Sequence, residues 1–278
     1  MMKKIILIAC AALLLASFAE KPSDELTFMS FNIRNSSAWK QDGDNDWAHR
    51  REAVVEMIRK EKPDALGMQE MLPDQLAYLD SALAKEYGRI GVGRDDGIAK
   101  GENMCIYYRK DRLELKDWHT RWLSNTPDSV SFGWDAACRR TATIAHFRDL
   151  NTGKELVYIN THLDHVGQVA RASSTRLLAL WADEYGKDMP VIIGGDMNSG
   201  LEDTIFSNLY RNGLTEARDL LNFKDTCITY NAYGKGKPSQ IDHFFVRNVA
   251  VKEFSTLNGD YGVPYISDHY PVIIKFNN

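Results

Sequence analysis

Short apolar runs alternate along the chain with longer segments whose apolar residues recur every three or four positions. Runs rich in β-branched and aromatic residues predict strands, and the periodic segments predict helices. We expect strands at residues 26–33, 65–68, 87–92, 104–108, 113–123, 141–147, 156–160, 191–193, 241–246, 249–257 and 271–276. We expect helices after residue 45 or 46, from residue 73, at 171–185 and at 203–210. Interleaved strands and helices with a β-rich middle predict two mixed sheets covered by helices.

The segment 171–185 shows the helical period most fully. Leu177, Leu180 and Trp181 recur at the spacing of one helix face. We therefore expect these three side chains to form the stripe that this helix buries against a sheet.

Six short polar cassettes stand where apolar runs end. Each puts Asn, Asp, Glu or His at the end of an expected strand, and loops at strand ends are where a rigid scaffold presents catalytic groups. The cassettes are Ser30-Phe31-Asn32-Ile33-Arg34, Met68-Gln69-Glu70, Asn160-Thr161-His162-Leu163-Asp164-His165, Gly194-Gly195-Asp196-Met197-Asn198-Ser199, Gln240-Ile241-Asp242-His243 and Ser267-Asp268-His269-Tyr270-Pro271. Gathered in one place, they would make a site rich in carboxylate, amide and imidazole groups. That inventory suits a hard divalent cation and the hydrolysis of a phosphate ester.

Glu70 and Asn32 are candidate metal ligands. Glu70 directly follows a buried strand, where a carboxylate is costly unless it is paired or binds a metal. The alternatives are a salt-bridging Glu70 and a turn-forming Asn32. Together the two residues offer oxygen ligands, which favour Mg²⁺ or Mn²⁺ over zinc, the rival metal for a set of His and Asp residues.

His162, His165 and His269 are three of the seven histidines of the chain, and all three fall in cassettes. Such a histidine, taken alone, is more often a satisfied core or surface group than a catalyst. Asp242 and Asp268 change this balance. A carboxylate that accepts a hydrogen bond from one imidazole nitrogen fixes the tautomer and raises the basicity of the other nitrogen.

Asp196 and Asn198 form a further candidate pair, two positions apart after two glycines. The pair is equally typical of an Asx turn. In a catalytic site the Asp would position a water molecule, and the Asn would donate to a phosphoryl oxygen. No Gly-x-Ser-x-Gly elbow, Walker loop or Rossmann fingerprint occurs, so nothing predicts a serine nucleophile or a dinucleotide.

The N-terminus has the pattern of a cleaved leader. Two lysines precede an apolar run at residues 5–18, and small residues lead up to Ala19. We expect a signal peptide at residues 1–19 and export to the periplasm or the medium, with residues 20–278 forming a single domain. The apolar run is too short for a stable membrane span. The alternatives are a lipoprotein anchored through Cys10 and an N-terminal core helix.

The remaining composition is that of an ordinary globular protein, with 44% hydrophobic and 26% charged residues. The formal net charge of −4 becomes −6 when the two lysines of the leader are removed. This acidity disfavours long DNA as a partner. The other cysteines, Cys105, Cys138 and Cys227, are widely spaced and form neither a disulfide scaffold nor a Cys-x-x-Cys zinc site. We expect a monomer.

Taken in order, the six cassettes resemble the endonuclease/exonuclease/phosphatase superfamily of DNase I-like enzymes. Any one cassette is unspecific, but six in the order of the family, over residues 26–276, are specific. The chain is similar to small secreted bacterial members. The resemblance implies an α+β fold, a four-layer α/β/β/α sandwich with the site at the edge between two packed sheets. It also implies hydrolysis of a phosphate ester by direct attack of water.

The resemblance implies a role for each matching position. Asn32 and Glu70 resemble the metal site, with Asp268 assisting. Asp242 and His269 resemble the pair in which the carboxylate orients the imidazole that activates water.

His162 resembles the histidine that stabilises the transition state or protonates the leaving oxygen. Asp196 and Asn198 resemble the residues that align water and phosphate. These residues would complete the catalytic set.

Arg140 lies where secreted bacterial members carry a phosphate-binding arginine, an exposed strand arginine being the alternative. Asp164 and His165 extend the His162 cassette and are candidate substrate-binding residues. We therefore expect an exported, Mg²⁺-dependent phosphoesterase, and we favour a phosphodiesterase. The alternatives are a phospholipase C-like or sphingomyelinase-like enzyme, a sugar-phosphate or inositol-phosphate phosphatase, and a non-catalytic binding module on the same fold.

Overall fold

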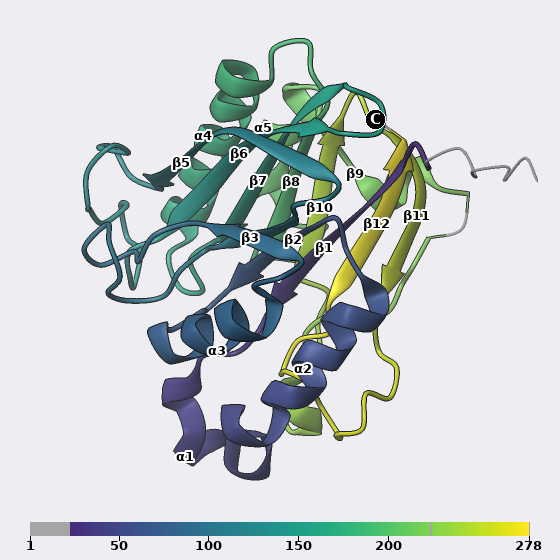
Figure 1. Ribbon diagram of the computed structural model, residues 1–278. Coiled ribbons are helices and arrows are strands. Elements are labelled where there is room, and N and C mark those ends of the chain that lie inside the picture. Colours follow the sequence, from purple (N-terminus) through teal and green to yellow (C-terminus); the bar gives the residue numbers. More distant parts are fainter. Residues whose placement is uncertain (1–22, 223, 278) are drawn as a thin grey trace, which may run out of the picture.

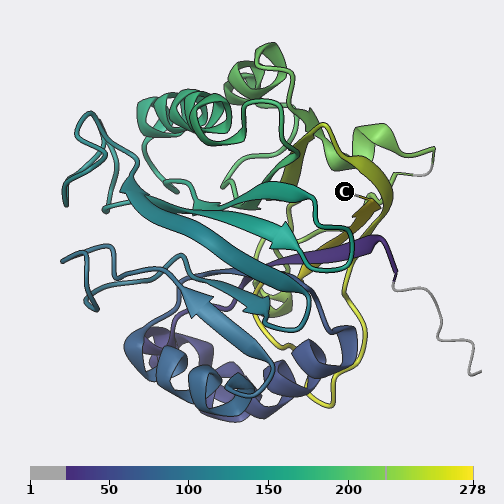
Figure 2. The ribbon, with the colours of Figure 1, turned by 45° about the horizontal axis from the view of Figure 1, so that its top comes forward.

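The structure is a computed structural model that describes residues 23–222 and 224–277, so the leader expected at 1–19 lies outside the described residues. Two sheets pack face to face between two layers of helices (Figure 1). Figure 2 views these layers from the side, with one helix layer below the sheets and the other above them. The lower layer contains α2 (Trp47–Glu61) and α3 (Pro73–Leu83), and the upper contains α4 (Gln168–Gly186) and α5 (Ser207–Arg211). The predicted α/β/β/α sandwich is confirmed.

The first sheet has the strand order β11-β12-β1-β2-β4-β3. Its strands are β1 (Glu25–Asn32), β2 (Ala65–Gln69), β3 (Tyr87–Ile90), β4 (Ile106–Arg109), β11 (Ala250–Thr256) and β12 (Val272–Asn277). Because β1 and β2 are parallel, with Asn32 opposite Gln69, the polar residues after both strands reach the same edge of the sheet. β12 runs antiparallel to β1, so the residues that precede β12 lie at this edge as well.

The second sheet has the order β5-β6-β7-β8-β10-β9. Its strands are β5 (Leu113–Trp122), β6 (Thr141–Asp149), β7 (Glu155–His162), β8 (Val191–Asp196), β9 (Thr215–Glu216) and β10 (Asp242–Arg247). Parallel pairing of β7 with β8 sets His162 opposite Asp196. Antiparallel pairing of β10 with β8 sets Asp242 opposite the same aspartate. Three cassettes therefore meet at one end of this sheet.

Three apolar layers hold the sandwich together. Successive side chains of a strand point to opposite faces, and β1 uses both faces. Met29 and Phe31 pack with the α2 and α3 side chains, whereas Leu26 and Phe28 fill the space between the sheets. The third layer lies between the second sheet and α4 with α5. Burial of both faces of the central strands explains why they are nearly continuous apolar runs.

Two helix predictions need correction. Trp181 lies on the buried stripe of α4 as predicted, but Leu180 is 54% exposed, and the rest of the stripe is formed by Leu178 and smaller residues. The helix expected at 203–210 is a 3₁₀ turn followed by α5, and Asp203 caps the turn by accepting from the backbone N–H of Ile205. The remaining short helices are α1 (Trp39–Asp42) and 3₁₀ segments at Ser36–Ala38, Gly43–Asn45, Thr204–Phe206, Ala217–Leu220 and Ala232–Gly234. Among residues 23–222 and 224–277, none of the helices combines the length and apolar character needed to cross a bilayer.

Candidate active site

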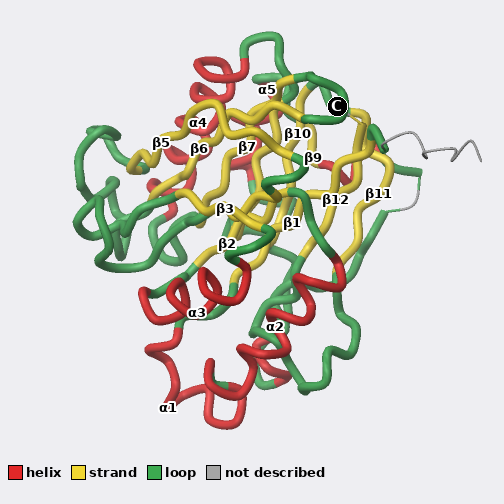
Figure 3. The backbone as a smooth tube through the Cα atoms, viewed as in Figure 1, coloured by secondary structure: helices red, strands yellow, loops and turns green. Residues whose placement is uncertain are grey.

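The cassettes converge on a cavity of about 600 Å³ at the polar edge of the two sheets. Eight of the eleven site residues predicted from the sequence line this cavity: Glu70, Arg140, His162, His165, Asp196, Asn198, Asp268 and His269. The other three, Asn32, Asp164 and Asp242, are buried behind the lining. Figure 3 shows in green the loops that connect the strands and helices of the two sheets. The two sheets thus supply one shared site.

Asn32 joins the two sheets at the base of the cavity. Its amide nitrogen donates to Glu70 Oε1 and to Asp196 Oδ2, both at 3.0 Å. Its amide oxygen accepts from the backbone N–H of Arg34 at 3.0 Å. In this arrangement Asn32 orients Glu70. The sequence predicted that Asn32 binds a metal directly, and this would require its side-chain amide to rotate so that the oxygen replaces the nitrogen on the Glu70 side.

Glu70 is held in position from its other side by Asn35. Its Oε2 accepts from the Asn35 side-chain amide at 2.7 Å and from the Asn35 backbone N–H at 3.0 Å. Although burial opposes it, these hydrogen bonds and the one from Asn32 lower the pKa of Glu70. Glu70 is therefore an ionised carboxylate that faces the cavity at neutral pH.

Asp268 is a second carboxylate in the same cavity wall. Burial and then the charge of Glu70 raise the pKa of Asp268, while His269 and Arg34 oppose the rise. Arg34, which pairs with Asp42 at 3.1 Å, lies 3.8 Å from Asp268. The charge of Glu70 disfavours ionisation of Asp268, and a bound divalent cation would relieve this, so Glu70 and Asp268 fit the hard oxygen donors that Mg²⁺ prefers.

His269 lies between two further carboxylates. Its Nδ1 donates to Asp242 Oδ2 at 2.8 Å, and its Nε2 lies 3.7 Å from Asp196 Oδ2. Burial lowers the pKa of His269, but the charges of Asp242 and Asp196 outweigh this and raise it. Ligand atoms of these three residues lie within 4.8 Å of one another, so they are a second group able to hold a cation. Their mutual hydrogen bond and ion pair already satisfy the imidazole without one.

His162 also lies close to Asp196, but its pKa is shifted in the opposite direction to that of His269. Asn198 donates from Nδ2 to His162 Nε2 at 3.0 Å, and the same ring nitrogen lies 3.3 Å from Asp196 Oδ2. Burial, together with the charges of Arg140 and Arg94, lowers the pKa of His162 well below its usual range. His162 is therefore neutral at neutral pH, whereas His269 is charged.

Arg140 reaches the cavity from a buried network. Its Nε donates to Asp164 Oδ2 at 3.3 Å, and its Nη2 donates to His165 Nδ1 at 3.0 Å. Asp164 also accepts from the backbone N–H groups of Gly167, Val166 and Ala137. Although burial opposes it, these bonds hold the pKa of Asp164 far below its usual range. Asp164 thus positions Arg140 and the surrounding loop from behind, and the cavity-facing groups are Arg140 and His165.

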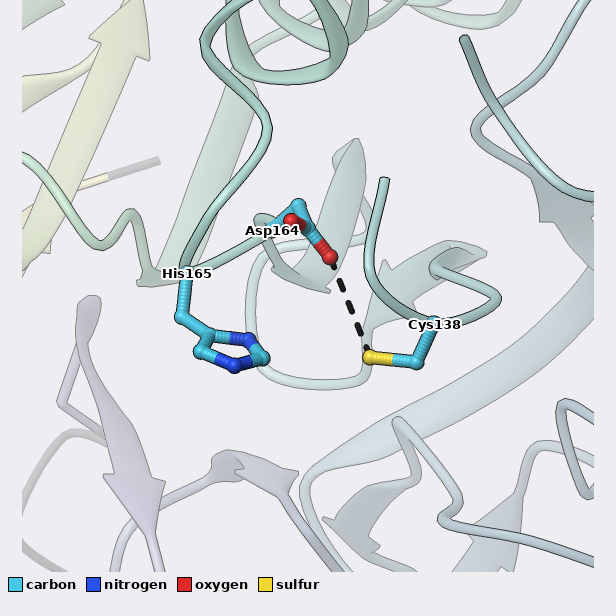
Figure 4. A group of neighbouring side chains, drawn as sticks. All are labelled: Cys138, Asp164 and His165. Carbon is cyan, nitrogen blue, oxygen red and sulfur yellow. Dashed lines mark hydrogen bonds between the residues drawn. The ribbon is translucent and has the colours of Figure 1, made fainter. Parts of the chain in front are cut away.

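Cys138 stands beside this network (Figure 4). Its Sγ lies 3.8 Å from Asp164 Oδ2, and ligand atoms of Cys138, Asp164 and His165 come within 4.8 Å of one another. Arg140 donates to both of the latter residues, and burial raises the pKa of the Cys138 thiol. A guanidinium at the centre of the cluster already supplies the positive charge that a cation would provide.

Eight further residues of the cavity wall were not predicted as site residues: Arg34, Asn35, Arg94, Glu102, Cys138, Tyr230, Ser239 and Ile241. Arg34 belonged to a quoted cassette, but nothing in the sequence assigned it a partner. Arg94 and Glu102 lie in a polar loop without periodicity, and only its fold-back brings them to the site. The Tyr230 ring lies 5.0 Å from the His269 ring, centroid to centroid, and covers one side of the imidazole.

Residues 29–269 match the sequence profile of the Endonuclease/Exonuclease/phosphatase family. The chain belongs to this family, which confirms the resemblance seen in the cassettes. An endonuclease/exonuclease/phosphatase from Bacteroides vulgatus is 34% identical, and its structure matches with a TM-score of 0.85 over 91% of this chain and 98% of that one.

Two further relatives extend the comparison. A mannosyl-6-phosphatase from Bacteroides thetaiotaomicron VPI-5482 is 32% identical, with a TM-score of 0.84 over 90% of this chain and 99% of that chain. An uncharacterised protein of Acanthamoeba polyphaga mimivirus is 25% identical over 271 residues, which cover 90% of this chain and 97% of the viral protein. The similarity extends over nearly the full length of each relative.

Proposed function

We propose that this protein hydrolyses phosphate esters with the help of a bound divalent cation. The observation that carries the proposal is the geometry around Asp196. This buried carboxylate lies 3.0 Å from the Asn32 amide, 3.3 Å from His162 and 3.7 Å from His269. One cavity thus combines candidate metal ligands, a charged imidazole and a neutral imidazole, which is the equipment that phosphoryl transfer to water requires.

Glu70 and Asp268 are the residues that would hold the cation, with Asn32 orienting Glu70. When bound, Mg²⁺ or Mn²⁺ supplies positive charge that neutralises the phosphate and stabilises the charge developing in the transition state. The donors are oxygen atoms, which supports these metals over zinc.

The sequence analysis gave His269 the task of taking a proton from water. His269 is held in its charged form by Asp242 and Asp196, and an imidazolium cannot accept a proton. Burial raises the pKa of Asp196, which His269 opposes, so this carboxylate binds a proton more readily than an exposed aspartate. We therefore propose that Asp196 accepts the proton of the attacking water, while His269 stabilises the negative charge that develops nearby.

His162 and Asn198 lie where they would contact the phosphoryl group. The Asn198 amide donates to His162 Nε2 and fixes the direction of the neutral ring, so that the imidazole would pack against the phosphoryl group. Arg140 is pre-positioned by Asp164 and would add a guanidinium contact to the phosphate.

The cavity supports a small substrate. Its volume of about 600 Å³ is typical of sites for small ligands, whereas proteins that bind long nucleic acid track the backbone along an extended basic groove. The 32% identity with a mannosyl-6-phosphatase supports a sugar-phosphate monoester, which was an alternative in the sequence analysis. We now place this substrate class ahead of the phosphodiester that the sequence analysis favoured.

A phosphoester panel tests the proposal. Turnover of sugar phosphates, inositol phosphates, bis(p-nitrophenyl) phosphate, sphingomyelin and plasmid DNA is compared with and without EDTA. We expect EDTA-sensitive release of phosphate from a sugar phosphate. Turnover of the diester alone would support the phosphodiesterase predicted from the sequence. No turnover of any ester would favour a non-catalytic binding module.

A further inference from the structure

The wall of the cavity beyond Glu70 is formed by the loop of residues 91–105, which connects β3 to β4. The loop folds back on itself, because the Arg94 backbone N–H donates to the Glu102 carbonyl at 3.0 Å. It is tied down at two further points. The Asn103 N–H donates to the Met71 carbonyl at 2.8 Å, and the Trp122 indole N–H donates to the Arg94 carbonyl at 2.8 Å. The wall is therefore a fixed part of the site.

Arg94 and Glu102 present an ion pair to the cavity from this wall. Arg94 Nη1 lies 2.5 Å from Glu102 Oε2, and the two side chains are only 12% and 15% exposed. Arg94 Nε is buried and has no hydrogen-bond partner among the described residues. A largely buried ion pair contributes little net stability, because desolvation offsets its attraction. A recognition role explains its presence better than a structural one.

The pair differs from Arg140 in the chemistry that it offers. Burial and then the charge of Glu70 raise the pKa of Glu102 to about 7, against the effect of Arg94. When Glu102 is ionised, the two charges of the pair compensate each other, so the pair adds little net attraction for a phosphate. The guanidinium donates hydrogen bonds and the neighbouring carboxylate accepts them. The pair therefore suits hydroxyl groups, which both donate and accept hydrogen bonds. Two adjacent hydroxyl groups on a sugar ring can bond to both members of the pair at once.

We propose that Arg94 and Glu102 bind vicinal hydroxyl groups on the alcohol part of the phosphate ester, and so select sugar phosphates over esters of simple alcohols or phenols. The inference rests on the proposed hydrolase function and names the feature of the substrate that this wall recognises. It also makes Arg94 and Glu102 specificity residues, separate from the groups around Asp196 that act on the phosphate.

The test compares two substrates across variants of the full-length protein at saturating Mg²⁺. Mannose 6-phosphate carries vicinal hydroxyl groups, and p-nitrophenyl phosphate carries none. Losing a hydrogen bond to a charged group costs about 10-fold or more in kcat/KM, so Glu102→Gln should lower the ratio of the mannose 6-phosphate value to the p-nitrophenyl phosphate value by at least that factor. Arg94→Gln should lower the same ratio.

Asp95→Asn is the matched control. Asp95 lies in the same loop and pairs with Arg139 at 3.4 Å, but it does not line the cavity. This variant should leave the ratio of the two values unchanged. Thermal unfolding of every variant verifies folding, and Glu102→Asp replaces Glu102→Gln if the latter does not fold, because shortening the side chain should also lower the ratio.

The outcomes separate the two proposals. If the wild-type protein hydrolyses neither substrate in an EDTA-sensitive manner, the proposed function fails. If it hydrolyses both, and the Glu102 and Arg94 variants change both values by the same factor or not at all, the hydrolase stands and the hydroxyl-binding pair is refuted. A larger loss on p-nitrophenyl phosphate would indicate instead that the pair binds the phosphate.

Discussion

Asp242 accepts a hydrogen bond of 2.8 Å from His269 Nδ1 across the junction of the two sheets. Asp242 begins β10 in the second sheet, and His269 precedes β12 in the first. The imidazole is therefore oriented only when both sheets are packed in register. The pKa of His269 therefore depends on the packing of the two sheets against each other.

Asp242→Asn should reduce kcat by about 100-fold or more at saturating Mg²⁺, by analogy with other imidazole–carboxylate pairs. The amide keeps the shape of the side chain but removes the charge that raises the pKa of His269. Steady-state kinetics on the best phosphoester measure the effect, and the His269 imidazole signal in an NMR titration should show a lower pKa. A variant with more than half of wild-type kcat would contradict the role given to this pair.

Glu70→Gln should weaken metal activation. The variant replaces an ionised oxygen ligand with a neutral amide of the same size, so the Mg²⁺ concentration for half-maximal activity should rise by about 10-fold or more. The protein is dialysed against EDTA and titrated with Mg²⁺, and Mn²⁺ binding is followed in parallel by electron paramagnetic resonance. An unchanged Mg²⁺ requirement together with unchanged Mn²⁺ binding would remove Glu70 from the metal site.

Asp164→Asn should destabilise the fold at neutral pH by about 2–4 kcal/mol, since Arg140 would lose its buried counter-charge. The pKa of Asp164 is lower in the folded protein than the usual value of about 3.9, so its contribution is complete above that pH and is lost as the pH falls through the folded value. Urea unfolding between neutral and acidic pH should therefore show the difference from wild type shrinking below about pH 4.

Asp117→Asn is the control for this measurement. Asp117 is 64% exposed and pairs with His119 at 3.0 Å on the surface, so the variant should change stability by less than about 0.5 kcal/mol. A loss of stability at Asp164 that stayed constant down to the most acidic pH would refute the electrostatic explanation.

The leader remains a prediction, since it lies outside the described residues. Mass spectrometry of the exported protein should find Glu20 as the first residue. A lipid-modified Cys10 at the N-terminus would support the lipoprotein alternative, and an intact Met1 would show that the leader is retained.

The arrangement of the cassettes could be predicted because each one lies at a strand terminus: four follow a strand, and those around Asp242 and His269 lie at the start of β10 and before β12. Parallel pairing brings Asn32 and Glu70 together at the ends of β1 and β2, and His162 and Asp196 together at the ends of β7 and β8. Packing of the two sheets then joins the two groups through Asn32. The periodic signal was weaker for helices. Leu180 was assigned to the buried face of α4, but that face is formed by Leu178, Trp181 and smaller residues, and Leu180 is exposed to solvent.

The loop contributions could not be predicted in the same way. Arg94 and Glu102 meet only because their loop folds back and is tied to Met71 and Trp122, and neither contact leaves a periodic pattern. The protonation states of Asp196 and His269 could not be predicted from the sequence either. Burial raises the pKa of Asp196, whereas the charges of Asp242 and Asp196 raise the pKa of His269 against the effect of burial, and both causes arise from tertiary packing.

The most direct test of the account is phosphate release from a sugar phosphate by the wild-type protein and by His269→Ala, each assayed as purified, after EDTA and after restoration of Mg²⁺. We predict that EDTA abolishes wild-type turnover, that Mg²⁺ restores it, and that the variant is at least about 100-fold slower than the wild type whenever Mg²⁺ is present. Turnover that survives EDTA, or a variant as fast as the wild type, would contradict a metal-dependent hydrolase centred on this imidazole.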